Sequence, residues 1–289
     1  MQFLLDRVLN RRHVLVCSLK LEIDRDCLLV LAIIVRVPFC QATQSFVMTD
    51  KKFYDALVVG TGFGGLYQLL LLRQLGLSVK GIDKAGDVGG TWYWNRYPGA
   101  RTDVESYVYR YSWDKELLQN AEWKDNYLTQ PEIEAYFQTV ARKHDLYPLI
   151  QFNAGLTDAI WDDEKNLWNV RISTGEEFTV RYIVAAVGIL HAGYVPDYPG
   201  LKTFKGQVAH SASWKSNLVY KGKRVGVIGS GASGVQLVSS LGEEASTLTH
   251  FIRHAQYVIP TALRRVSPEE RKLINERYEK IWHNVRFLL

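Results

Sequence analysis

The chain has 289 residues, a net charge of +5, 47% hydrophobic residues and 22% charged residues. These proportions are ordinary for a folded globular protein and argue against disorder. A charge this mild favours neither nucleic acid nor a membrane surface as a partner. The three cysteines, Cys17, Cys27 and Cys40, all precede Met48. Disulfide scaffolds, thiolate metal sites and cysteine nucleophiles are therefore excluded from the chain after Met48.

Residues 1–47 differ in character from the rest. Their one apolar run, Cys27 to Val35, is too short to span a bilayer, which takes about 20 residues. It also lacks the short basic start and the cleavage site of a signal peptide. We interpret 1–47 as an atypical extension, disordered or non-native, with a targeting or anchoring segment as the alternative. The working protein is expected to begin at Met48, to have no membrane span and to be cytoplasmic.

Strand-like and helix-like segments alternate after Met48. A strand at 53–59, a helix at 62–75 and a second strand at 78–83 predict a buried parallel sheet. A second helix is expected at 130–144, and 149–187 is expected to form a meander of strands. The segments 224–228, 232–241 and 248–253 then repeat the strand, helix, strand pattern.

A final amphipathic helix is expected after Ser267. Ser267 is a typical N-cap, Pro268 suits the first turn, and Glu270 is placed to complete a capping box. The apolar residues that follow fall on one helical face, which needs a surface to pack against. They are Leu273, Ile274, Tyr278, Ile281, Trp282 and Val285.

Two segments match the pattern G-x-G-x-x-G, and each lies between a predicted strand and a predicted helix. The first has Gly60, Gly62 and Gly65, and the second runs from Gly229 to Gly234. In this pattern the first glycine permits a tight turn, the second lets a pyrophosphate approach the backbone, and the third lets helix and strand pack closely. The alternative to dinucleotide binding is that these glycines serve packing only. That interpretation is disfavoured because the pattern would then have to occur twice by chance.

The residues that end the second strands differ between the two segments. After the first glycine segment, the second strand ends at Asp83, where a carboxylate can hold ribose hydroxyls. Arg253 and His254 follow the second, where a cation suits a 2′-phosphate. One free and one phosphorylated ribose indicate FAD and NADPH, and the missing cysteines direct a flavin toward oxygen chemistry rather than disulfides. His250 and His254 lie on or beside a strand, so no metal site is expected.

Two further motifs carry a family resemblance. Residues 89–103 read GGTWYWNRYPGARTD, and 204–214 fit F-x-G-x-x-x-H-x-x-x-W with Phe204, Gly206, His210 and Trp214. Together with both glycine segments, these motifs resemble the type I Baeyer–Villiger monooxygenases from about Lys52 to Leu289. In the family this fingerprint continues with Pro or Asp directly after the tryptophan, and this chain departs from it there with Lys215. Related N- and S-oxidising flavin monooxygenases have tyrosine in place of Trp214, so the resemblance favours the ketone-oxidising branch.

The resemblance implies an α/β fold with two Rossmann-like dinucleotide-binding domains, the NADP domain being inserted in the FAD domain and incomplete here. It implies an FAD-binding domain at 48–200 with the meander 149–187, a fingerprint linker at 201–222 and an NADP-binding domain at 223–289. The chain is accordingly expected to be a C-terminally truncated member that binds flavin poorly and fails to turn over.

The resemblance also implies site residues. FAD would be held by Gly60, Gly62, Phe63, Gly65, Asp83, Gly90, Thr91, Trp92, Asp103 and Tyr109. NADPH would be held by Arg101, Thr102, Gly229, Ser230, Gly231, Ala232, Ser233, Gly234, Gln236, Arg253 and His254. Asp103 matches the active-site carboxylate that orients an arginine, which is expected downstream of this chain. His210 and Trp214 are expected to couple domain movement, although His210 alone also suits a buried structural histidine.

The implied reaction uses NADPH and O2 to insert oxygen beside a ketone carbonyl through a peroxyflavin, giving an ester or lactone. Two other functions stay open. One is a flavin-dependent N- or S-oxygenase, and the other is a nucleotide-binding remnant without catalysis.

Overall fold

The computed structural model describes residues 52–120, 122–190 and 192–288, so the expected extension 1–47 lies outside the described residues. The described residues form two compact units. The first unit comprises residues 52–90 and 137–189, and the second comprises 91–136 and 190–288 apart from the two gaps. The functional domain boundary at residue 200 stays a prediction.

The first unit is built on a six-stranded sheet with the order β3-β2-β1-β6-β5-β4. Its strands are β1 (Lys52–Val59), β2 (Val79–Ile82), β3 (Ile150–Gln151), β4 (Leu156–Asp162), β5 (Leu167–Ile172) and β6 (Glu177–Ala185). β1 runs parallel to both β2 and β6, while β4, β5 and β6 are antiparallel. Ala56, Leu57 and Val58 at the centre of β1 are fully buried, as expected for a strand covered on both faces. The predicted parallel sheet is confirmed.

The expected meander is also confirmed, and its turns lie where the sequence placed them. Trp161 and Trp168 face each other across β4 and β5, with ring centroids 5.3 Å apart. Asn166 (φ 53°) and Gly175 (φ 86°) take the left-handed conformation that the two tight turns require. β6 then returns alongside β1, which carries the end of the meander to the first glycine segment.

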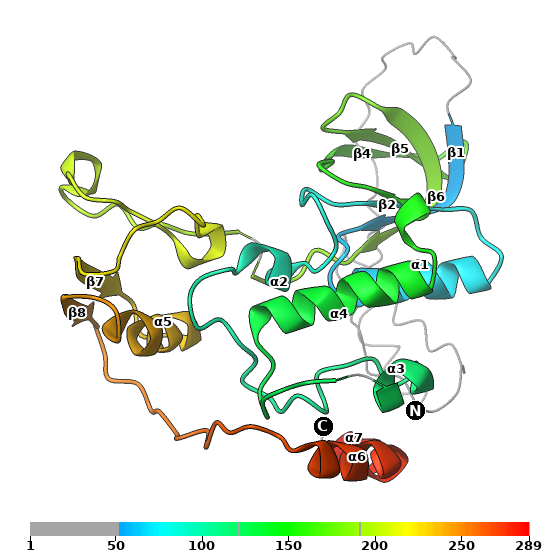
Figure 1. Ribbon diagram of the computed structural model, residues 1–289. Helices are drawn as coiled ribbons and strands as arrows, with labels where there is room; N and C mark the ends of the chain where they lie inside the picture. The colour runs from blue at the N-terminus through cyan, green and yellow to red at the C-terminus, as the bar shows by residue number, and fades with distance from the viewer. Residues whose placement is uncertain (1–51, 121, 191, 289) are drawn as a thin grey trace, which may run out of the picture. The chain divides into compact units, whose positions relative to one another are not determined.

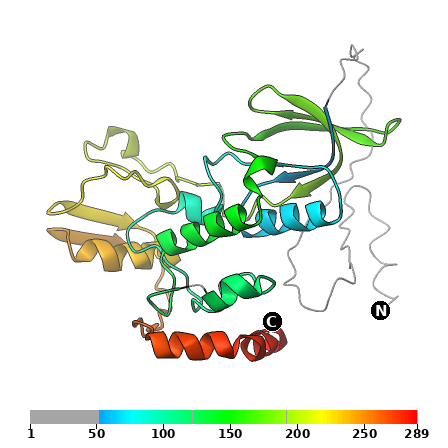
Figure 2. The same cartoon turned by 45° about the vertical axis from the view of Figure 1, so that its right-hand side comes forward.

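Two helices pack beside each other in this unit. α1 (Phe63–Gln74) begins directly after Gly62 and packs on β1 and β2. The part of α4 (Gln130–Lys143) that belongs to this unit, from Phe137 on, lies alongside it (Figures 1 and 2). The rings of Phe63 and Phe137 meet edge to face at 5.5 Å. Arg73 near the end of α1 donates to the carbonyl of Asp145 at 2.7 Å, which fixes the far ends of the two helices.

The second unit contains the predicted second βαβ segment. It consists of β7 (Arg224–Ile228), α5 (Ala232–Gly242) and β8 (Thr247–Phe251), with β7 and β8 parallel. Val227, Leu237 and Leu241 form a small core under α5. Short elements complete the unit: α2 (Thr91–Trp94), α3 (Lys115–Asn120), and the 3-10 turns η2 (Leu201–Thr203) and η3 (Ser211–Ser213).

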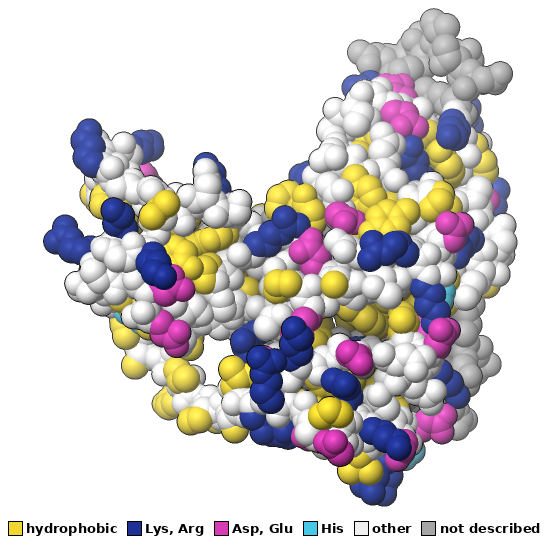
Figure 3. All heavy atoms as spheres, in the orientation of Figure 1, with side chains coloured by type: hydrophobic (Ala, Val, Ile, Leu, Met, Phe, Trp, Pro, Cys, Tyr) yellow, Lys and Arg dark blue, Asp and Glu magenta, His cyan; other side chains and the backbone are white. Residues whose placement is uncertain are grey.

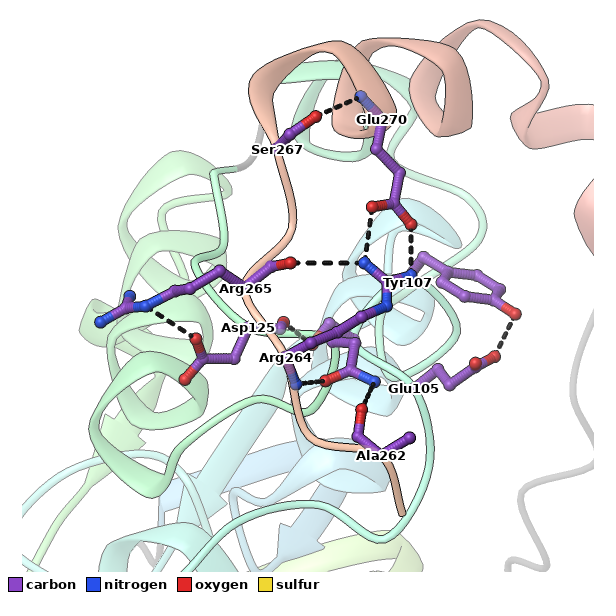
Figure 4. Close-up of polar contacts among 10 residues, drawn as sticks. Glu105, Tyr107, Asp125, Ala262, Arg264, Arg265, Ser267 and Glu270 are labelled. Carbon is purple, nitrogen blue, oxygen red and sulfur yellow. Dashed lines mark hydrogen bonds and ion pairs between the residues drawn. The ribbon is translucent and has the colours of Figure 1, made fainter.

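The prediction of one final helix is wrong in two respects. The structure has α6 (Pro268–Glu276) and α7 (Tyr278–Leu288), separated at Arg277, whose N–H donates to the carbonyl of Ile274 at 3.1 Å. Ser267 does cap the first turn by accepting from the N–H of Glu270 at 3.2 Å. The Glu270 carboxylate, however, binds both terminal nitrogens of Arg264 at 2.6 and 2.7 Å instead of completing a capping box (Figure 4).

The apolar face of these helices finds its partner within the second unit. Tyr278 and Trp282 are buried against Leu118 of α3, whereas Leu273 is 44% exposed and does not join them. The side chain of Val285 lies outside the described residues. A strap, residues 262–267, leads into α6 and is held by Asn126 and by the Arg265–Asp125 ion pair (Figure 4).

No helix in residues 52–288, as far as the structure describes them, combines the length and the apolarity of a membrane span. Figure 3 shows basic and acidic side chains mixed over the visible face.

Candidate functional site

The first glycine segment is a turn that tolerates no side chain at two of its positions. Gly60 has φ of +96°, and a Cβ there would lie 2.5 Å from the carbonyl oxygen of Ala186, at the end of β6. A Cβ on Gly65 would lie 1.8 Å from the carbonyl oxygen of Gly60. The first and third glycines therefore do what the motif predicts. Ala186 was not predicted, because nothing in its local sequence shows which strand ends beneath the turn.

Gly62 and Gly90 lie close together at the start of α1 and leave no room for a side chain on Gly90. A Cβ on Gly90 would lie 2.8 Å from the Cα of Gly62, and the N–H of Gly89 donates to the carbonyl of Thr61 at 3.2 Å. Gly62 is the N-cap of α1 and offers no side-chain cap to the first turn. The helix N–H groups are thus free of a capping side chain and face a cradle that any Cβ would fill. Such a site fits the pyrophosphate of a dinucleotide.

Asp83 lies at the end of β2 and is held from two sides. Its Oδ2 accepts from the N–H of Thr61 at 2.7 Å and from the Thr61 hydroxyl at 2.8 Å, and its Oδ1 accepts from the N–H of Ala85 at 2.8 Å. A carboxylate has about four acceptor positions, so one on Oδ1 remains for a ribose hydroxyl. Thr61 was missed by the sequence reasoning, although its place inside the motif is the signal that marks it.

The loop between Asp83 and Gly90 is anchored through Asp87. Its carboxylate accepts from the Gln138 side chain on α4 at 2.9 Å and from the Tyr147 hydroxyl at 2.8 Å. Tyr147 opens the 3-10 turn η1 (Tyr147–Leu149). The three residues come from distant parts of the sequence, so no local pattern predicts the anchor.

In the second unit, Trp92 and Tyr109 form a polar and aromatic pair. The indole N–H of Trp92 donates to the Tyr109 hydroxyl at 2.9 Å, and the rings meet edge to face at 5.7 Å. Burial raises the pKa of Tyr109, and the negative charge of nearby Asp103 raises it further. The Asp103 side chain is exposed, and its role beside a cofactor stays a prediction.

Arg101 and Thr102 have firmly held backbones but unpartnered polar atoms. The N–H of Thr102 donates to the Leu128 carbonyl at 2.9 Å, and Arg101 forms a β-bridge with Thr129. The Thr102 hydroxyl and one terminal nitrogen of Arg101 are buried and have no hydrogen-bond partner within the part of the chain that the structure describes. Buried polar groups are normally satisfied. These two atoms therefore fit a polar ligand at residues 101–103.

The second glycine segment repeats the geometry of the first. Gly229 has φ of +108°, and a Cβ on Gly234 would lie 2.1 Å from the Gly229 carbonyl oxygen. Gly231 is the N-cap of α5, again without a side-chain cap, and among the described residues no atom beyond its chain neighbours and the α5 backbone lies within 4 Å of a Cβ built there. His250 on β8 lies beneath the turn, with Nε2 2.8 Å from the Gly229 carbonyl oxygen. This cradle also fits a pyrophosphate.

The remaining predicted ligands of the second segment lie around this cradle in different ways. Ser230, Ala232 and Ser233 belong to the turn and to the first residues of α5, and Arg253 and His254 are exposed just beyond β8. The side-chain amide of Gln236 is hydrogen-bonded to the Tyr97 hydroxyl and to the Arg101 carbonyl. The described residues contain no group of three or more His, Cys, Asp or Glu side chains placed to hold a metal.

The fingerprint residues lie in the same unit but make mainly local contacts. His210 accepts through Nδ1 from the N–H of Ala212 at 3.1 Å and so caps η3. The Trp214 ring lies 6.3 Å from that of Tyr220 and packs on the core under α5. Phe204 is 62% exposed. The coupling role expected of His210 and Trp214 stays a prediction.

Comparison with known proteins agrees with these features. Residues 54–286 match the family described as flavin-binding monooxygenase-like. The chain is 46% identical over 238 residues to phenazine N-monooxygenase PhzNO1 of Lysobacter antibioticus, covering 82% of this chain and 44% of that protein. It is 45% identical to cyclohexanone 1,2-monooxygenase of Acinetobacter sp., covering 81% and 43%. A crystal structure of cyclohexanone monooxygenase from Rhodococcus sp. Phi1 bound to NADP+ superimposes with a TM-score of 0.79 at 45% identity, covering 82% and 45%.

The chain therefore belongs to the flavin-binding monooxygenase-like family, and the sequence resemblance is confirmed at that level. The chain spans less than half the length of these relatives.

Proposed function

We propose that this chain binds FAD at the first glycine segment and NADPH at the second, and serves a Baeyer–Villiger-type oxygenation of a ketone. The observation that carries the proposal is the pair of cradles at Gly60–Gly65 and Gly229–Gly234, each at a helix N-terminus without a side-chain cap. The relatives at about 45% identity that oxidise cyclohexanone support the substrate class. A cytoplasmic location, where NADPH is regenerated, is part of the proposal.

The proposal assigns a cofactor-binding role to residues beside each cradle. Asp83, oriented by Thr61, would hold the ribose of FAD, and Arg253 and His254 would meet the 2′-phosphate of NADPH. FAD, when bound and reduced by NADPH, supplies the activation of O2. The buried donor of Arg101 and the hydroxyl of Thr102 would bind the polar edge of a cofactor.

Binding is the measurement that tests the cofactor assignment. The Gly62→Ala variant places a Cβ in the first cradle and the Gly231→Ala variant places one in the second, so each serves as control for the other. FAD is titrated by the change in flavin fluorescence, and NADP+ by calorimetry. We expect Gly62→Ala to weaken FAD binding alone and Gly231→Ala to weaken NADP+ binding alone. Absence of saturable FAD binding to the parent chain would refute the proposal.

The second candidate is N-oxygenation, which the identity of 46% with phenazine N-monooxygenase PhzNO1 favours. With NADPH and O2, the ketone assignment predicts a product of cyclohexanone heavier by one oxygen atom, detected by mass spectrometry and formed at a very low rate, because the chain is expected to bind flavin poorly. Oxygenation of phenazine but not of cyclohexanone would assign the chain to the N-oxidising class. Binding of both cofactors without either product would identify a nucleotide-binding protein without catalysis.

A further inference from the structure

One side chain of the second unit joins the helix behind the second cradle to the segment that carries Asp103. Gln236 lies on α5, the helix that begins at the second glycine segment. Its Oε1 accepts from the Tyr97 hydroxyl at 2.8 Å, and its Nε2 donates to the carbonyl of Arg101 at 3.1 Å. Tyr97 is 8% exposed, and burial raises its pKa, against an opposing hydrogen bond with Ser233. Both polar ends of the Gln236 amide are thus used within the protein.

The backbone between these two contacts lies directly on α5. Gly99 has φ of +82°, and a Cβ there would lie 2.0 Å from the Ser240 hydroxyl oxygen and 3.0 Å from the Gln236 carbonyl oxygen. Tyr97 and Ala100 are buried in the core that α5 covers. The close approach, the two hydrogen bonds and the shared core are separate observations, and all attach residues 97–101 to this helix.

Arg101, Thr102 and Asp103 continue this segment without a break. Their backbone is held on the other side by the Thr102 hydrogen bond to Leu128. Their position therefore depends on two attachments, one to residues 128–129 and one to α5 through Gln236, the Gly99 contact and the shared core. Only the second leads to the nucleotide cradle, because α5 starts there.

We propose that Gln236 is a positioning residue and not a nucleotide ligand: through its amide, α5 holds residues 97–103, so that a dinucleotide bound at 229–234 also orders Arg101–Asp103. The second half of this statement rests on the proposed function, since it needs a dinucleotide at 229–234. The first half does not. Turning the amide toward a nucleotide would break both hydrogen bonds that now hold Tyr97 and Arg101, at a cost that a new contact would have to offset.

The first arm of the test needs no nucleotide. Hydrogen exchange of the full chain is followed by mass spectrometry in four variants. Gln236→Leu removes both contacts, Gln236→Glu keeps the acceptor for Tyr97 but loses the donor to Arg101, and Tyr97→Phe removes only the hydroxyl. Ser239→Ala is the control, because Ser239 is exposed on the same helix and its hydroxyl donates to the Val235 carbonyl at 3.0 Å.

We expect exchange in residues 97–103 to be faster by roughly tenfold in Gln236→Leu, by less in Gln236→Glu and Tyr97→Phe, and unchanged in Ser239→Ala, from the size of one or two net hydrogen bonds. Unchanged exchange in β7 and β8, which belong to the same unit as Gln236, shows that this unit is folded in each variant. Unchanged exchange in 97–103 in the folded Gln236→Leu variant would overturn the proposal.

The second arm adds NADP+ and separates positioning from ligand contact. In the parent chain NADP+ is expected to slow exchange in 97–103. In Gln236→Leu this slowing is expected to disappear, while the dissociation constant of NADP+ rises by less than about threefold. A rise of tenfold or more with normal exchange in 97–103 would make Gln236 a nucleotide ligand. NADP+ that binds the parent chain without slowing 97–103 would refute the coupling. Absence of NADP+ binding to the parent chain would refute the proposed function and leave the first arm standing.

Discussion

Substitution of Gly65 by alanine tests whether the first cradle depends on direct backbone contact. A Cβ at this position would lie 1.8 Å from the Gly60 carbonyl oxygen, where real Cβ atoms keep at least 3.0 Å. Both partners belong to backbone, so no side chain can turn aside, and α1 would have to move by more than about 1 Å. Overpacking of this kind costs about 3 kcal/mol. Because alanine regains about 1 kcal/mol of helix propensity, we expect a net loss of about 2 kcal/mol.

For a protein of this size, 2 kcal/mol corresponds to a fall in Tm of roughly 4–8 °C. Thermal unfolding followed by circular dichroism measures it, with Gly62→Ala as the matched control. A Cβ on Gly62 would lie 3.3 Å from the Cα of Gly90, which needs a shift of only a few tenths of an ångström. We expect Gly62→Ala to keep its Tm within about 2 °C. Equal Tm values for the parent and Gly65→Ala, or equal losses in both variants, would refute the reasoning.

Three further predictions concern the second unit. Trp282→Ala should lower the free energy of unfolding by about 3 kcal/mol in urea titrations, because Trp282 is buried against Leu118, and an unchanged midpoint would contradict this packing. Burial raises the pKa of Tyr278 from 10.0 to about 12, so the stability tied to its neutral form is complete below pH 10 and is lost as the pH rises toward 12. Tyr278→Phe should flatten that decline in unfolding curves recorded between pH 9 and pH 12, and an equally steep curve would show that the group does not contribute. His210→Ala should lower stability by about 0.5–1 kcal/mol, whereas His210→Asn, which keeps a capping acceptor, should cost less; equal losses would mean that the cap contributes nothing.

The sequence predicted those parts of the fold in which a local residue pattern specifies a single helix, strand or turn. The buried strand β1, the meander turns at Asn166 and Gly175 and the βαβ unit around α5 were all predicted within a few residues. The break between α6 and α7 was not predicted, because the apolar residues keep their helical spacing across Arg277. The capping box failed because Glu270 binds Arg264, a residue just outside the helix that the pattern does not include.

The candidate site likewise contains residues that local sequence predicts and residues that it does not. The glycines were predictable because their function is a property of their own backbone and of its immediate neighbours. Ala186 and the Asp87 anchor, with its partners Gln138 and Tyr147, depend on which distant strands and helices meet, so a single sequence does not reveal them. Gln236 was predicted as a ligand from its position after a glycine segment, but its contacts depend on where residues 97–101 pass over α5.

The two cradles share one constraint and differ in another. The third glycine meets the first glycine's carbonyl oxygen in both, at 1.8 Å for Gly65 and 2.1 Å for Gly234, so this contact belongs to the turn itself. Among the residues that the structure describes, the second glycine faces Gly90 in the first cradle and open space in the second. The first cradle thus has two backbone walls that position an anion from both sides, while the second has one. The proposed assignment of FAD to the first cradle and NADPH to the second fits this difference, because a site with two backbone walls is preorganised for a group that stays bound and a site with one leaves a path for a group that enters and departs.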